Sequence, residues 1–503
     1  MNIKRAKEEI KDAIEAYLMK DEYGCYEIPQ LRQRPLLLIG PPGVGKTQIM
    51  EQIARECKLA IVSYTITHHT RQSAVGLPYI VKKQYGGREA SVTEYTMSEI
   101  VASVYDKMEC TGLSQGILFI DEINCVSETL APAMLQFLQG KTFGNHRIPE
   151  GWVIVAAGNP PEYNKSVREF DVVTLDRIRR IQVEPDYEVW KAYAYEQGLH
   201  PAVISYLNTR TENFCRIETT VDGRLFATPR GWEDLSELLL VYERLGKKAD
   251  REVIEEYIQF PRISKDFANY LELFYKYQAD YQVDEILSGT LRESLLNRLK
   301  RAELDERLHV IGMLLSGLQK GFRRAADQSK RTELLMEMLK GLDPDGNQQE
   351  GSMEDRLKEL REAKGQEFKA KRQAGLLTRR EDQLFWDVLE LLSEYEKRLQ
   401  KEGQVSLREG WEKVRSMFRT EAEAYDTLLS QAGEALEHAF DFMEAAFGSS
   451  QEMVAFLTEL NAGYYSVAFL QEYECERYYQ YNEGLLFHKQ EDELLSRINA
   501  LGK

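Results

Sequence analysis

Short apolar runs and longer amphipathic segments alternate through the first 190 residues of this 503-residue chain. The runs are too short for buried helices and are flanked by turn residues, which is typical of strands buried on both faces of a parallel sheet. The intervening segments have apolar residues at helical spacing. The pattern therefore predicts an α/β fold, a parallel sheet with helices on both faces. The predicted strands cover residues 36–39, 61–64, 117–120, 153–157 and 180–183.

Within this region, two β-rich runs at 79–84 and 91–95 flank the turn Tyr85-Gly86-Gly87 and predict a β-hairpin. From about residue 190 onward, apolar residues recur at helical spacing and strand signals almost vanish. We expect residues 1–189 to form the α/β domain, 190–277 a small helical domain, and 278–503 a long all-α region. The linker-like composition of residues 341–351 predicts a division of that last region near 341–355.

The charge balance of the chain argues against one class of function, direct nucleic-acid binding. Lys and Arg number 65 and Asp and Glu 82, a formal net charge of −17. This excess argues against direct nucleic-acid binding over a broad surface, although a local basic pore is compatible with it. No apolar run approaches the roughly 20 residues of a membrane span, and the N-terminal segment has no continuous apolar stretch of the signal-peptide kind. We therefore expect a cytoplasmic protein.

The six cysteines are scattered along the chain. None forms a C-x-x-C pair, and none lies at ligand spacing from a histidine. This distribution favours reduced cysteines that pack as small core residues over a disulfide framework or a zinc site.

A glycine-rich loop follows the first predicted strand directly. Its pattern, G-x-x-x-x-G-K-[ST], lets backbone N–H groups surround phosphate oxygens at positions where side chains would clash. The lysine can reach the β- and γ-phosphates, and the threonine hydroxyl can bind Mg²⁺. We expect the following residues to bind a nucleotide: Gly40, Pro41, Pro42, Gly43, Val44, Gly45, Lys46, Thr47 and Gln48.

Polar residues follow two later strands. Asp121 and Glu122 end the apolar run 117–120, where Asp121 can hold Mg²⁺ together with Thr47, and Glu122 can act as general base toward a water molecule. Asn159 follows the strand at 153–157, and its neutral amide can orient that water or contact the γ-phosphate. Alternatively, Asn159 only caps the turn before Pro160.

These motifs together resemble those of AAA+ ATPases. Residues 40–47 resemble the Walker A loop, 117–122 the Walker B strand, and Asn159 the sensor 1 position. More narrowly, residues 144–164 and the motif Thr174-Leu175-Asp176-Arg177 resemble the MoxR and dynein-related branch. The resemblance covers roughly residues 1–275, whereas residues 278–503 match no extension of the family.

The resemblance implies roles for two arginines. Arg177 would be the arginine finger, supplied to the active site of a neighbouring subunit, with Arg179 and Arg180 as nearby rivals and Arg168 as a weaker one. Alternatively, any of these arginines only forms a surface salt bridge. Arg230, in the stretch Ala227-Thr228-Pro229-Arg230, would be sensor 2 at the start of a lid helix. The hairpin at about 79–95 would be the insert in helix 2, and residues 141–147 the pre-sensor 1 hairpin.

The function implied is that of a MoxR-type ATPase that binds ATP and Mg²⁺ and assembles into a ring, expected to be a hexamer. Such a ring acts as a chaperone-like remodeller of a partner protein or complex, with an adaptor or client that carries a von Willebrand factor A domain. A nucleotide-driven motor or switch subunit of a nucleic-acid defence or restriction-like system is the alternative, and there either ATP or GTP could be used. A scaffold that binds ATP but turns it over slowly is a third hypothesis, against which the intact Glu122 argues.

Overall fold

The computed structural model describes residues 1–68, 74, 76–143, 145–163, 167, 170, 172–221, 223–343, 352–402 and 406–483. The chain divides into two compact units, and each is treated by itself. The first contains residues 1–189 and 365–383. The second contains residues 190–364 and 384–503.

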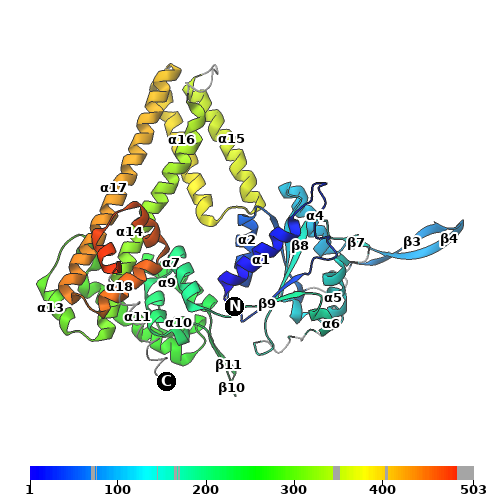
Figure 1. The fold of residues 1–503 in the computed structure, drawn as a ribbon, viewed down its shortest axis with the longest axis horizontal. Helices are drawn as coiled ribbons and strands as arrows, with labels where there is room; N and C mark the ends of the chain where they lie inside the picture. Colours follow the sequence, from blue (N-terminus) through cyan, green and yellow to red (C-terminus); the bar gives the residue numbers. More distant parts are fainter. Residues whose placement is uncertain are drawn as a thin grey trace, which may run out of the picture. The chain divides into compact units, whose positions relative to one another are not determined.

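The first unit is built around a five-stranded parallel sheet (Figure 1). The strands are adjacent in the order β2 (Ala60–Thr65), β5 (Gly116–Asp121), β8 (Trp152–Gly158), β1 (Leu36–Ile39) and β9 (Arg179–Gln182). Strand β1 therefore lies between β8 and β9, with Leu36 opposite Val155 on one side and Arg179 on the other. This arrangement confirms the predicted α/β fold with a parallel sheet.

Helices cover both faces of the sheet. Helices α1 (Ile3–Leu18) and α2 (Lys46–Glu56) pack on the face that carries Leu36, Leu38 and Phe119. Helices α4 (Glu99–Thr111) and α5 (Ala131–Gly140) pack on the face that carries Leu37 and Leu118. Alternate residues of one strand thus enter two different cores, which explains why the strands read as continuous apolar runs in the sequence.

Two β-hairpins are separate from the main sheet. The longer pairs β3 (Pro78–Tyr85) with β4 (Arg88–Tyr95), is exposed along most of its length, and extends away from the rest of the first unit (Figure 1). The shorter pairs β6 (Thr142–Phe143) with β7 (His146–Arg147). A short helix, α6 (Val172–Leu175), precedes β9.

The second unit is almost entirely helical among its described residues. Its helices are α7 (Tyr187–Gln197, which begins in the first unit), α8 (Pro201–Thr209), α9 (Pro229–Arg244), α10 (Arg251–Tyr257), α11 (Pro261–Tyr281), α12 (Val283–Leu287), α13 (Glu293–Arg301), α14 (Leu304–Leu339), α15 (Met353–Ala374), α16 (Arg379–Glu402), α17 (Leu407–Phe447), α18 (Gln451–Ala462) and α19 (Tyr464–Glu472). Residues 365–383, which are the last part of α15, the turn after it and the first part of α16, belong to the first unit. The long all-α C-terminal region is confirmed.

A hairpin of β10 (Arg216–Thr220) and β11 (Gly223–Ala227) interrupts these helices, and the sequence analysis did not predict it. Helix α14 packs against α8, α11, α17 and α19. The predicted domain limit at 277 falls inside α11, and the domain limits stay a prediction. Among the described residues, no helix combines the length and apolar character needed to cross a membrane.

Candidate functional site

The glycine-rich loop begins at the end of β1, an interior strand of the sheet, and enters α2 at Lys46. Gly45 has a φ of 89°, a left-handed conformation that a residue with a side chain rarely adopts. Gly40 lies so close to β9 that a Cβ atom on it would be 2.6 Å from the carbonyl oxygen of Val183. Glycine is therefore required at both ends of this loop.

Lys46 connects the loop to the neighbouring strand β8. Its side chain is buried, and Nζ donates hydrogen bonds to the carbonyl oxygens of Gly40 and Pro41, both at 2.8 Å. The same atom donates to Oδ1 of Asn159 at 3.1 Å. The structure thus brings together the lysine and the amide that the sequence analysis selected from positions 113 residues apart.

Thr47 and Asp121 meet at the carboxyl edge of the sheet. Thr47 Oγ1 donates to Asp121 Oδ2 at 3.1 Å. Hydroxyl and carboxylate oxygens are the ligands that Mg²⁺ prefers, and it usually takes its remaining ligands from phosphates and water. No group of three or more His, Cys, Asp or Glu side chains that could hold a metal occurs among the residues described. Thr47 and Asp121 supply two oxygen atoms that could hold Mg²⁺.

Glu122 directly follows this pair and is half-buried. Its φ of 56° is left-handed and disfavoured for a residue with a side chain. Two hydrogen bonds hold it, from Glu122 N to Asp121 Oδ1 at 2.8 Å and from Cys125 N to Glu122 O at 2.9 Å. Burial raises the pKa of the nearby Cys125 thiol, and the charges of Glu122 and Asp121 add to that rise.

The sequence analysis missed Asn124. This residue is buried two positions after Glu122, and its Nδ2 donates to the backbone oxygen of Asn159 at 2.7 Å. A polar residue two positions after the acid pair was the only available signal. The bond spans 35 residues and ends on a backbone carbonyl, which no motif encodes.

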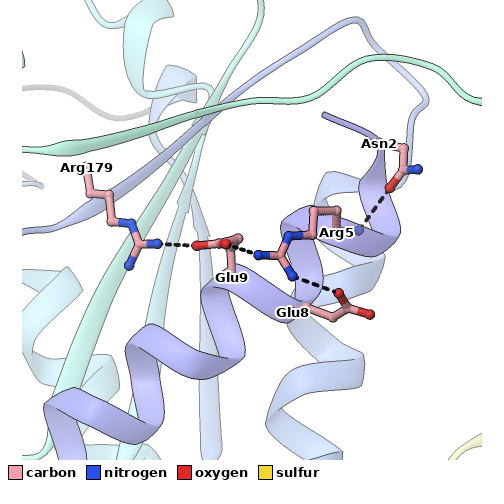
Figure 2. Close-up of polar contacts among 5 residues, drawn as sticks. All are labelled: Asn2, Arg5, Glu8, Glu9 and Arg179. Carbon is pink, nitrogen blue, oxygen red and sulfur yellow. Dashed lines mark hydrogen bonds and ion pairs between the residues drawn. The ribbon is translucent and has the colours of Figure 1, made fainter.

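The candidate finger arginines differ in their surroundings. Arg177 is exposed, and its guanidinium hydrogen-bonds to the neutral side chain of Gln139 on α5. Arg179 pairs instead with the carboxylate of Glu9 on α1, which also accepts a 2.5 Å bond from Arg5 (Figure 2). A carboxylate neutralises Arg179 within its own subunit, so this geometry favours Arg177 as a residue available to a neighbour.

Arg180 is exposed and adjacent to Arg179 on β9, so it remains a rival to Arg177. Arg168 lies outside the described residues. Arg230 is exposed in the first turn of α9, where the hydroxyl of Thr228 caps the helix by accepting from Gly231 N at 3.2 Å. Arg230 belongs to the second unit, and its role stays a prediction.

A comparison with known protein families finds a match within the first unit. Residues 35–178 match the family model of the AAA domain (dynein-related subfamily). This segment is therefore an AAA domain. The match includes the glycine-rich loop, the acid pair, Asn159 and Arg177. No curated protein sequence matches the chain.

Proposed function

We propose that this AAA+ protein binds ATP with Mg²⁺ in the first unit and hydrolyses it in a site that a neighbouring subunit completes. One observation carries the proposal. Lys46 and Thr47 on the loop face Asn159 and Asp121 at the ends of two neighbouring strands, at 3.1 Å in each case. A cation, a hydroxyl, a carboxylate and an amide therefore meet at the start of α2, where the helix N-terminus favours an anion.

Each side chain has a chemical role in this proposal. Lys46 would bind the β- and γ-phosphates, and Thr47 and Asp121 would hold Mg²⁺, which neutralises phosphate charge when bound. Glu122 would accept a proton from water as the water oxygen bonds to the γ-phosphorus. The bond from that phosphorus to the bridging oxygen then breaks, and ADP leaves. Asn159 would orient the attacking water.

Arg177 supports the part of the proposal that concerns assembly. An arginine brought from a neighbouring subunit would neutralise charge on the phosphoryl group during its transfer. We therefore propose a homo-oligomeric ring, expected to be a hexamer, that uses hydrolysis to remodel a protein client in the manner of the MoxR branch. The exposed hairpin β3–β4, with Tyr85 at its end 58% exposed, offers a surface for such a client or for a von Willebrand factor A adaptor.

The direct test compares ATP binding and hydrolysis in wild type and in the Glu122→Gln variant. Loss of the general base should lower kcat by about 10²–10⁴-fold with ATP affinity retained. Glu150→Gln is the matched control, because it makes the same change at an exposed carboxylate that precedes β8, and it should leave both quantities unchanged. Normal turnover in Glu122→Gln would contradict the assignment of the base, and absence of ATP binding in wild type would contradict the proposed function.

A further inference from the structure

Asn124 lies where two strands of the site end, and its side chain fits against a glycine. It occupies the short 3-10 turn Ile123–Cys125 after β5, and its Nδ2 donates to the oxygen of Asn159 after β8. A Cβ atom on Gly158 would lie 2.5 Å from Asn124 Oδ1 and 2.7 Å from its Cγ. The amide therefore occupies space that only a glycine at 158 leaves open.

This bond is one link in a continuous chain of hydrogen bonds. Asn124 holds the backbone of Asn159, whose Oδ1 accepts from Lys46 Nζ, and Lys46 in turn holds Gly40 and Pro41 of the loop. At the other end, the turn that contains Asn124 begins at Glu122, whose backbone is in a left-handed conformation. Such a conformation is disfavoured for a residue with a side chain and persists only where its surroundings hold it.

We propose that Asn124 is a positioning residue for nucleotide hydrolysis, acting through both Asn159 and Glu122. Its hydrogen bond fixes the Asn159 backbone, so that the Asn159 side chain faces Lys46 and the reacting phosphate. The same bond anchors the turn after Glu122 and thereby keeps the general base aimed at the attacking water. The inference rests on the proposed function, since it deepens the account of the same site.

The consequence is an effect on kcat rather than on nucleotide binding. Asn124→Ala leaves the loop, Lys46 and Thr47 in place, so KM for ATP should stay within about threefold of wild type. Without the bond, the orientation of Asn159 and Glu122 is no longer fixed, and kcat should fall by at least about tenfold.

A second variant separates positioning from packing. Gly158→Ala should displace the Asn124 amide and lower kcat as Asn124→Ala does, because the new methyl group would overlap that amide. In the double variant Asn124→Ala/Gly158→Ala, the methyl group fills part of the vacated space. Thermal stability should therefore recover relative to the single variants, while kcat stays low because the hydrogen bond is still missing. A double variant with wild-type kcat would show that Asn124 only fills space and would overturn the proposal.

Gln30 provides a matched control in the same unit. Its buried side chain also bonds to backbone carbonyls near β8, those of Ile148 at 3.0 Å and Pro149 at 2.9 Å, but before the strand begins. Gln30→Ala should lower thermal stability and leave kcat unchanged. An equal fall of kcat in this control would mean that general loosening of the domain explains the result, and the proposal for Asn124 would fail.

The failure of this inference is distinct from failure of the proposed function. An active wild type that is disabled by Glu122→Gln but unaffected by Asn124→Ala overturns the positioning role alone. A wild-type protein that hydrolyses no ATP at any protein concentration overturns both the positioning role and the proposed function.

Discussion

Replacing Lys46 with alanine removes the only charged side chain that the structure places on the glycine-rich loop itself. Lys46 is 8% exposed, and its Nζ donates to Gly40 O, Pro41 O and Asn159 Oδ1. The variant thus loses these hydrogen bonds and the cation that would meet the phosphates. Two separate quantities should change, the free energy of unfolding and the affinity for ATP.

The magnitudes follow from the contacts. At about 1 kcal/mol net for each hydrogen bond, the loss of the bonds to Gly40, Pro41 and Asn159 should lower the free energy of unfolding by about 3 kcal/mol. A unit charge pair about 4 Å apart at an effective dielectric constant of about 20 is worth about 4 kcal/mol, close to 10³-fold in Kd. Lys46 would give up part of its bonding to Gly40 and Pro41 when it binds phosphate. We therefore expect the affinity for ATP to fall by about 10²–10³-fold in Lys46→Ala.

The assay is isothermal titration of each variant with ATP and Mg²⁺, next to chemical denaturation of the same samples. Lys141→Ala is the matched control, since Lys141 is also buried and donates to Gln33 Oε1 at 3.2 Å, but it lies at the end of α5. The control should lose stability and bind ATP normally. A folded Lys46→Ala protein with an affinity within about threefold of wild type would refute the reasoning.

Three further predictions concern other positions. Burial, followed by the charge of Arg147, lowers the pKa of Lys141 from 10.5 to about 8. Between those two values, the unfolded state therefore binds more protons than the folded state. The unfolding free energy of wild type relative to Lys141→Met should rise from pH 8 to 10.5 by up to about 3 kcal/mol. Denaturation at each pH measures this difference, and a difference that does not change with pH would contradict the prediction. Arg177→Ala should bind ATP without hydrolysing it, and mixing it with Lys46→Ala should restore part of the rate; no rescue in folded, co-assembled mixtures would count against Arg177. Gly40→Ala should lower the unfolding free energy by about 1–3 kcal/mol because its methyl group meets Val183 O, and an unchanged denaturation midpoint would contradict the close approach.

The sheet could be predicted because burial on both faces leaves a strong signal in the sequence. Leu36 and Leu38 face one core while Leu37 and Ile39 face the other, so β1 reads as a continuous apolar run. The hairpin β10–β11 could not be predicted in this way. Arg216 and Glu218 place charges on β10, and its residues are half-buried or exposed, so no clear alternation marks it.

The parallel topology of the sheet explains why the site residues lie together, but it does not explain the finer contacts of the site. Parallel strands end at the same edge of the sheet, which is why Asp121 and Asn159 meet Thr47 and Lys46. The bond from Asn124 to the Asn159 backbone depends on the path of a turn that sequence does not specify. The roles of Arg177 and Arg230 depend on a neighbouring subunit and on the second unit, and both stay predictions.

The central claim is that ATP is hydrolysed at sites that two subunits complete. The most direct test is the steady-state ATPase rate per subunit, with Mg²⁺, over a range of protein concentration for wild type and Arg177→Ala. The account predicts a rate per subunit that rises with concentration in wild type and is absent in the variant at every concentration. A rate per subunit that is independent of concentration and equal in the two proteins would contradict it.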